Sequence, residues 1–132
     1  MNPIDANERV AARFEYRQDR GFGDPWRILD TKRSIIRGDC EDYALTVLSL
    51  IEGGGFFGVL GALWAKRTSI WFCIDPQGDR HHVLEYRKAG MVDNQAKRWE
   101  ERRWYESKGY RFKHRQPFAV CLFRLILGLF LS

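Results

Sequence analysis

Residues 38–44 carry the sequence GDCEDYA, which places a cysteine in the first turn of a helix. Asp39 is the expected N-cap, because its carboxylate can accept hydrogen bonds from the unpaired amides of that turn. Asp42, three residues later, completes a pattern close to a capping box. Apolar residues at helical spacing follow until three consecutive glycines at positions 53–55. The sequence therefore predicts a helix between Asp39 and these glycines.

Cys40 stands where a nucleophile is favoured, because unsatisfied amides and the positive end of the helix dipole stabilise a thiolate. Three neighbouring carboxylates, those of Asp39, Glu41 and Asp42, oppose that ionisation. We therefore expect a positively charged partner, and a histidinium is the usual one, since its ring takes the thiol proton and later returns it to the leaving group. A free cysteine is commonly a small packing residue, but the polarity around Cys40 argues against that role.

Three histidines are candidates for this partner: His81, His82 and His114. Residues 79–86 read DRHHVLEY, a strand pattern. Alternation along a strand places His82 and Leu84 on one face and His81 on the other, so one histidine is expected to point inward.

A carboxylate follows the histidine strand at a suitable place. Residues 90–92 predict a second strand after a short turn, antiparallel to the first. Asp93 ends that strand, so it could approach an imidazole and hold its tautomer, which is the task of the third member of a catalytic triad.

Length and composition allow one domain. The chain has 132 residues, of which 45% are hydrophobic and 30% charged, so it can bury a core and is not disordered. We expect residues 1–132 to form a single domain, which excludes two independent catalytic modules. The three cysteines are far apart and odd in number, so at least one thiol should be free and no CxxC metal pattern exists.

The remaining sequence is largely helical or loop-like before the three glycines at positions 53–55 and strand-like after them. An apolar stripe predicts a helix over residues 7–18, and glycine and proline predict a loop over residues 21–26. The further predicted elements are a helical turn over residues 30–36, antiparallel strands over 57–65, 69–74, 82–86 and 90–92, a helix over 94–107 and a strand over 110–114.

The last apolar stretch, residues 118–131, leaves three interpretations open. It has 14 residues with an arginine near its middle, and a helix that spans a bilayer needs about 20. We expect a buried core strand, with a docking segment for another chain as the alternative. Membrane association is the least expected.

Positive charge is concentrated in residues 94–115, which hold eight lysines and arginines against three glutamates, in a chain of net charge +5. A solvated face explains this, and an anionic polymer such as cell wall is the functional alternative. No nucleic-acid reading motif accompanies the charge, so we expect no specific nucleic-acid partner.

The ordered segments resemble the bacterial transglutaminase-like cysteine peptidase family. They are GDCEDYA at a helix start, a histidine before Val83-Leu84, Val92-Asp93-Asn94 at the end of the next strand, and Asp24-Pro25-Trp26 upstream, which is similar to the family's Asp-x-Trp segment. The resemblance covers about residues 24 to 99 and implies a papain-like α+β fold, in which the cysteine helix packs on an antiparallel sheet.

The resemblance also implies roles for particular residues. Cys40 is similar to the family's nucleophile, His82 to its general base and acid, and Asp93 to its orienting carboxylate, with His81 open as the alternative ring. The backbone amide of Cys40 would serve as one oxyanion donor, and Gln18 or Trp26 as the second. No cofactor is required, although some members depend on calcium.

Calcium in those members is linked to acidic residues beside the nucleophile. Asp39 and Glu41 hold those places here, and oxygen-only ligands suit calcium. The competing interpretation is that Asp39 and Asp42 only cap the helix.

We therefore expect a thiol hydrolase that cleaves an amide bond in a peptide or in peptidoglycan, with transamidation by the same triad left open. A phage tail- or virion-associated cell-wall peptidase is the natural refinement, with residues 118–131 docking it to a virion protein. No signal peptide is visible, so we expect synthesis in the cytoplasm, then incorporation into a virion or delivery to the cell envelope. The alternative is a non-catalytic structural or interaction protein that retains the fold.

Overall fold

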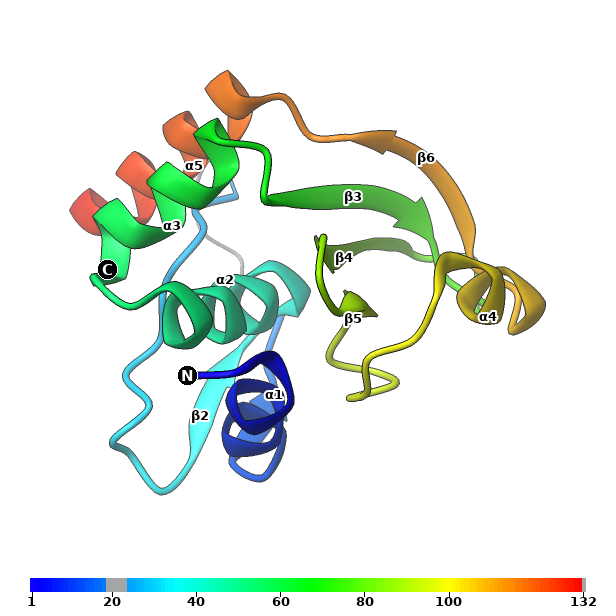
Figure 1. The fold of residues 1–132 in the computed structure, drawn as a ribbon, viewed down its shortest axis with the longest axis horizontal. Helices are drawn as coiled ribbons and strands as arrows, with labels where there is room; N and C mark the ends of the chain where they lie inside the picture. Colours follow the sequence, from blue (N-terminus) through cyan, green and yellow to red (C-terminus); the bar gives the residue numbers. More distant parts are fainter. Residues whose placement is uncertain (19–23, 132) are drawn as a thin grey trace.

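The computed structural model describes residues 1–18 and 24–131 and has an α+β architecture (Figure 1). Helices α1, α2, α3 and α5 are grouped at one end of the molecule, and the larger sheet with α4 forms the other end. The helices are α1 (Pro3–Ala11), α2 (Cys40–Glu52), α3 (Gly55–Trp64), α4 (Arg102–Ser107) and α5 (Phe118–Leu131), and the strands are β1 (Phe14–Tyr16), β2 (Ile36–Gly38), β3 (Thr68–Ile74), β4 (Arg80–Tyr86), β5 (Gly90–Val92) and β6 (Arg111–Arg115).

The larger sheet has the strand order β5-β4-β3-β6, and every neighbouring pair is antiparallel. The predicted antiparallel strands at 69–74, 82–86 and 90–92, and the further predicted strand at 110–114, are confirmed to within two residues at each end. β1 and β2 pair in parallel as a separate two-stranded sheet.

Apolar clusters lie on both faces of the larger sheet. The first cluster joins α2 to the sheet and includes Leu84. The second contains Val83 and Tyr105, the buried residue of α4. Neighbouring residues of β4 therefore point to opposite faces, so His82 shares the α2 face with Leu84 and His81 shares the other with Val83.

α2 begins and ends where the sequence predicts. The side chain of Asp39 accepts from the Asp42 amide, and the side chain of Asp42 accepts from the Asp39 amide, so both halves of the capping box are present. Gly53 ends the helix with a φ of 70°, a conformation that favours glycine. The N-terminal end of α2 points toward the sheet.

The prediction of a strand over residues 57–65 is wrong, because this segment is helix α3. Its buried residues, Val59, Ala62 and Leu63, are spaced three and four apart, which is helical periodicity. The run is almost wholly apolar, so alternation could not separate a buried helix from a strand.

Three other predicted boundaries differ from the structure. Residues 7–18 are not one helix, because α1 ends at Ala11 and β1 follows. The predicted helical turn over residues 30–36 is instead a set of turns and bends that leads into β2. Within 94–107 only α4 is helical, because Asp93 accepts from the Ala96 amide and holds a turn. Of the predicted loop over 21–26, residues 21–23 lie outside the described part of the chain, and 24–26 have no regular structure.

Residues 118–131 form helix α5 and not the expected core strand. Cys121 and Leu125, four residues apart, are buried against the first cluster, whereas Phe123, Leu129 and Phe130 are exposed. Among the described residues, no single helix is long and apolar enough to span a membrane. α2 and α3 together have the required length and apolarity, but a bend of 94° separates them.

Gly128 allows α5 to lie directly against Trp26. A Cβ atom at Gly128 would overlap the Trp26 carbonyl oxygen, and the Trp26 amide donates to the Arg124 carbonyl. We expect Gly128→Ala to lower the free energy of unfolding by about 1–3 kcal/mol, because the contact is with backbone that cannot rotate away.

Gly61→Ala is the matched control for this substitution in urea unfolding. Gly61 lies inside α3 with no heavy atom within 4 Å of its Cβ position, so alanine should be neutral or raise stability by up to about 1 kcal/mol. Equal stabilities of the two variants would contradict the close packing of α5 on Trp26.

Candidate active site

The structure brings Cys40 and His82 together. Cys40 is the first residue of α2, and His82 lies on β4, against which α2 packs. The Cys40 sulfur, a Glu41 carboxylate oxygen and a His82 ring nitrogen all lie within 4.8 Å of one another. Cys40 is partly buried, and His82 is 9% exposed.

The Glu41 carboxylate lies between the thiol and the ring. The Cys40 thiol donates to Glu41 Oε2 at 3.3 Å, and His82 Nδ1 donates to Glu41 Oε1 at 3.1 Å. Glu41 is only 5% exposed, and the side chain of Asp39 also hydrogen-bonds to it. One buried carboxylate therefore accepts from three neighbouring groups.

This carboxylate sets the charge state of the site. Burial acts to raise the pKa of Glu41, but hydrogen bonds from His82 and Asp39 lower it below its ordinary value, so Glu41 is ionised. Burial, followed by the charges of Glu41 and Asp39, raises the pKa of the Cys40 thiol well above its ordinary value, although the His82 amide opposes the shift. Cys40 is therefore a neutral thiol in this arrangement, not the thiolate of an ion pair.

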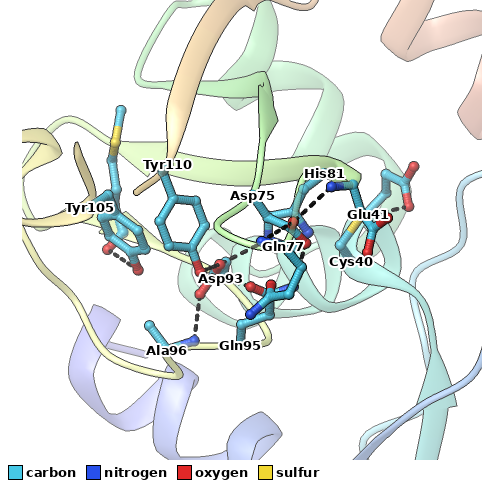
Figure 2. A network of polar contacts seen from close by, with 12 residues as sticks. Cys40, Glu41, Asp75, Gln77, His81, Asp93, Gln95, Ala96, Tyr105 and Tyr110 are labelled. Atoms are coloured by element: carbon cyan, nitrogen blue, oxygen red, sulfur yellow. Dashed lines mark hydrogen bonds and ion pairs between the residues drawn. The ribbon is translucent and has the colours of Figure 1, made fainter. Parts of the chain in front are cut away.

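The expected Asp93–His82 pair is not formed. Asp93 Oδ2 instead accepts from His81 Nε2 at 2.8 Å and from the Tyr110 hydroxyl at 2.7 Å, as Figure 2 shows. Asp93 is fully buried, and its Oδ1 accepts from the Ala96 amide. This group holds the turn after β5 and the second apolar cluster in place.

Strand register explains why Asp93 reaches His81 and not His82. Leu84 pairs with Val92 across β4 and β5, so the next residue, Asp93, comes opposite Val83. Residues opposite each other share a face of the sheet, and this face is the one that also carries His81. Both histidines are buried, at 4% and 9% exposure, whereas one inward histidine was expected.

Gln116 contacts the far nitrogen of His82, a contact that the sequence does not predict. Its side-chain nitrogen lies 2.9 Å from His82 Nε2. Since Nδ1 donates to Glu41, Nε2 is the accepting nitrogen, and the Gln116 amide donates to it. Gln116 directly follows β6 and belongs to no motif, so only the pairing of β6 with β3 reveals its position.

Trp26 and Gln18, the two predicted oxyanion donors, differ in position. Trp26 is buried with its ring edge-on to His82, at 5.6 Å between centroids. Its indole nitrogen has no hydrogen-bond partner among residues 1–18 and 24–131. Gln18 is exposed and lines, with Trp26, a cavity of about 1250 Å³ beside β2 whose described lining does not include Cys40.

The two predicted calcium ligands lie together, and a third carboxylate joins them. Oxygen atoms of Asp24, Asp39 and Glu41 lie within 4.8 Å of one another. Burial, and then the hydrogen bond and charge of Glu41, raise the pKa of Asp39 to about 10. The site thus offers the oxygen donors that calcium binds, but without metal Asp39 keeps its proton and Asp24 pairs with Arg124 at 3.0 Å.

The protonated Asp39 generates a testable pH dependence of stability. Its pKa is raised on folding, so the folded chain keeps a proton that the unfolded chain loses, and stability falls as pH rises above the unfolded pKa. An asparagine in its place would keep the N-cap without titrating. We expect the unfolding free energy of wild type, relative to Asp39→Asn, to fall between pH 5 and 7.5 by up to about 1.4 kcal/mol per pH unit.

Urea unfolding at several pH values measures this slope. Asp30→Asn, which removes one exposed loop carboxylate, controls for the change in net charge. Parallel curves for wild type and Asp39→Asn would show that Asp39 is not held protonated by the fold.

Removing the charge of Glu41 should activate the thiol. In Glu41→Gln the carboxylate that raises the pKa of Cys40 is absent, so more thiolate forms at neutral pH. We expect iodoacetamide to modify Cys40 at pH 7 at least threefold faster than in wild type, since each unit of pKa changes the thiolate fraction about tenfold.

Peptide mapping by mass spectrometry assigns the modification to Cys40. Glu52→Gln makes the same change at the other end of α2, where the carboxylate contacts Arg67 and Tyr86, and should leave the rate unchanged. An unaltered rate in Glu41→Gln would rule out control of the thiol by Glu41.

A scan against known protein families, a search of curated proteins and a search of solved structures find no match for this chain.

Proposed function

We propose that the protein is a thiol hydrolase, a cysteine peptidase or amidase, in which Cys40 is the nucleophile and His82 the general base and acid. The observation that carries the proposal is the meeting of the Cys40 sulfur and a His82 ring nitrogen at the N-terminus of α2. A thiol beside an imidazole, at a helix end that favours anions, is the arrangement that nucleophilic acyl transfer requires.

Glu41 keeps this pair in a resting state. Its carboxylate occupies the place between thiol and ring, so catalysis requires the Glu41 side chain to turn away when substrate enters. The Cys40 proton then passes to His82 Nδ1, which is free to accept once its own proton has moved to Nε2.

Gln116, rather than Asp93, is the orienting residue of the proposed site. In the resting state its amide nitrogen donates to His82 Nε2. Rotation of the amide by half a turn presents the oxygen instead, which accepts from the Nε2–H tautomer that catalysis needs. An amide in this place corresponds to the Cys-His-Asn variant of the triad.

The chemistry that follows is acyl transfer. The Cys40 thiolate attacks the amide carbonyl, and the first-turn amides of α2 stabilise the oxyanion. His82 protonates the leaving amine, and water then releases the acyl group from sulfur. The unsatisfied Trp26 indole N–H, beside His82, is the second donor that we propose.

Calcium fits the same proposal as an optional ligand. Asp24, Asp39 and Glu41 would hold it, and when bound it would supply positive charge that offsets their mutual repulsion. No catalytic step depends on it.

We further propose that the substrate is a peptide in cell wall and that the protein acts from a phage virion. The basic side chains between Lys97 and Arg115 are exposed, which suits an anionic polymer. The apolar side chains exposed on α5 would dock the protein to a virion component.

Incubation of purified protein with sacculi tests the enzyme proposal through release of free amine. We expect Cys40→Ala and His82→Ala to reduce the rate at least a hundredfold, because each removes a reacting group. His114→Ala, which alters an exposed histidine, should retain wild-type activity, and so should His81→Gln, whose amide can still donate to Asp93.

Equal amine release by wild type and Cys40→Ala would exclude thiol hydrolysis. Loss of activity in folded His81→Gln, with His82→Ala active, would assign the base to the opposite face of β4.

A non-catalytic interaction protein is the second candidate, favoured by the raised pKa of Cys40 and by the exposed side chains of Phe57, Trp64, Phe123 and Phe130 on α3 and α5. The test is the rate of alkylation at pH 6 in the presence of sacculi. A rate for Cys40 no greater than that of buried Cys73 or Cys121 would support the interaction protein.

A further inference from the structure

We propose that Cys40, Glu41 and His82 form a binding site for a thiophilic divalent metal such as Zn²⁺. The site is formed by these side chains whether or not Cys40 is a nucleophile. Its regulatory consequence rests on the proposed function: a metal held there would occupy nucleophile and base together and block hydrolysis reversibly.

The donor set selects the type of metal. The three residues offer one sulfur, one oxygen and one nitrogen. Thiolate and imidazole are ligands for zinc and its neighbours, whereas calcium takes only oxygen ligands. Three protein ligands and an open fourth position make up the common coordination of an accessible zinc site.

The spacing of the donors suits tetrahedral coordination. Bonds of 2.0–2.3 Å to zinc place neighbouring ligand atoms roughly 3.3–3.7 Å apart. The sulfur of Cys40 lies 3.3 Å from one Glu41 oxygen, and His82 Nδ1 lies 3.1 Å from the other. The sulfur and the ring nitrogen lie within 4.8 Å of one another, so the three donors can close around one metal ion through side-chain rotations.

Charge balance also favours a dication. Without metal, Glu41 carries a negative charge and the Cys40 thiol is neutral. Binding of Zn²⁺ releases the thiol proton, and the ring proton moves from Nδ1 to Nε2, so the complex of thiolate, carboxylate, imidazole and Zn²⁺ is neutral. One proton is released for each metal bound, and a buried neutral complex avoids the cost of a buried net charge.

The surroundings hold the ring in position for a metal. Gln116 contacts His82 Nε2, the nitrogen that must carry the proton when Nδ1 binds metal, and its amide oxygen can accept that proton. The rings of Trp26 and Phe72 lie against the imidazole at 5.6 and 5.7 Å between centroids. Such fixed orientation reduces the entropy lost on binding.

Titration of the full chain with Co²⁺ tests the proposal, because a cobalt–thiolate bond produces a charge-transfer band in the near ultraviolet. We expect one Co²⁺ per chain, displaced by Zn²⁺. The double variant Cys73→Ala/Cys121→Ala should keep the band, Cys40→Ser should lose it, and His82→Ala and Gln116→Ala should each weaken binding at least tenfold.

A second measurement uses only the wild-type protein and so does not depend on the folding of any variant. Zn²⁺ should slow alkylation of Cys40 at least tenfold, and an equal concentration of Ca²⁺ should not. Absence of the band together with unprotected Cys40 would overturn the proposal, as would a band that persists in folded Cys40→Ser. Tight binding of Ca²⁺ with no Zn²⁺ protection would assign the site to Asp24, Asp39 and Glu41 instead.

Metal binding and hydrolysis are measured separately, so their failures are distinguishable. Binding without amine release from sacculi would refute the hydrolase and leave the metal site standing. Cys40-dependent hydrolysis that Zn²⁺ does not inhibit would refute the metal site and leave the hydrolase standing.

Discussion

The buried carboxylate of Glu41 is the interaction on which the site depends. It accepts from the thiol of Cys40, the ring of His82 and the carboxyl of Asp39, and its position follows from the capping box that fixes the first turn of α2. The same carboxylate raises the pKa of the thiol. A cysteine thiol and a histidine ring within 4.8 Å of each other are therefore held in an unreactive state.

The two faces of β4 divide the polar chemistry between them. On the α2 face, His82 joins Cys40, Glu41 and Gln116. On the other face, His81 joins Asp93 and Tyr110 in a closed buried network that supports the second apolar cluster. The first group contains the partly accessible Cys40 thiol and lies beside the unpaired indole nitrogen of Trp26, whereas His81, Asp93 and Tyr110 are all buried, which is why the first group is the reactive candidate.

The sequence predicts those features that depend on local chemistry. The capping box, the glycine stop and the strand alternation rest on neighbouring residues and appear in the structure. The choice of His82 as the partner of Cys40 rests on the family resemblance, and the structure brings these two residues close together. The wrong predictions have a common physical origin. Apolar runs such as α3 and α5 carry no polar alternation, so their period could not be read. The partner of Asp93 depends on the register between strands, and the place of Gln116 on the pairing of β6 with β3.

Glu41 holds Cys40 as a thiol at neutral pH, and the Cβ chemical shift of Cys40 tests this most directly. The shift is followed by NMR as a function of pH in protein labelled at cysteine. Our account predicts that the shift stays at the thiol value beyond pH 9, because burial and the Glu41 charge both oppose ionisation. A Cys40 that titrates below pH 7, with its thiolate present at neutral pH, would contradict it.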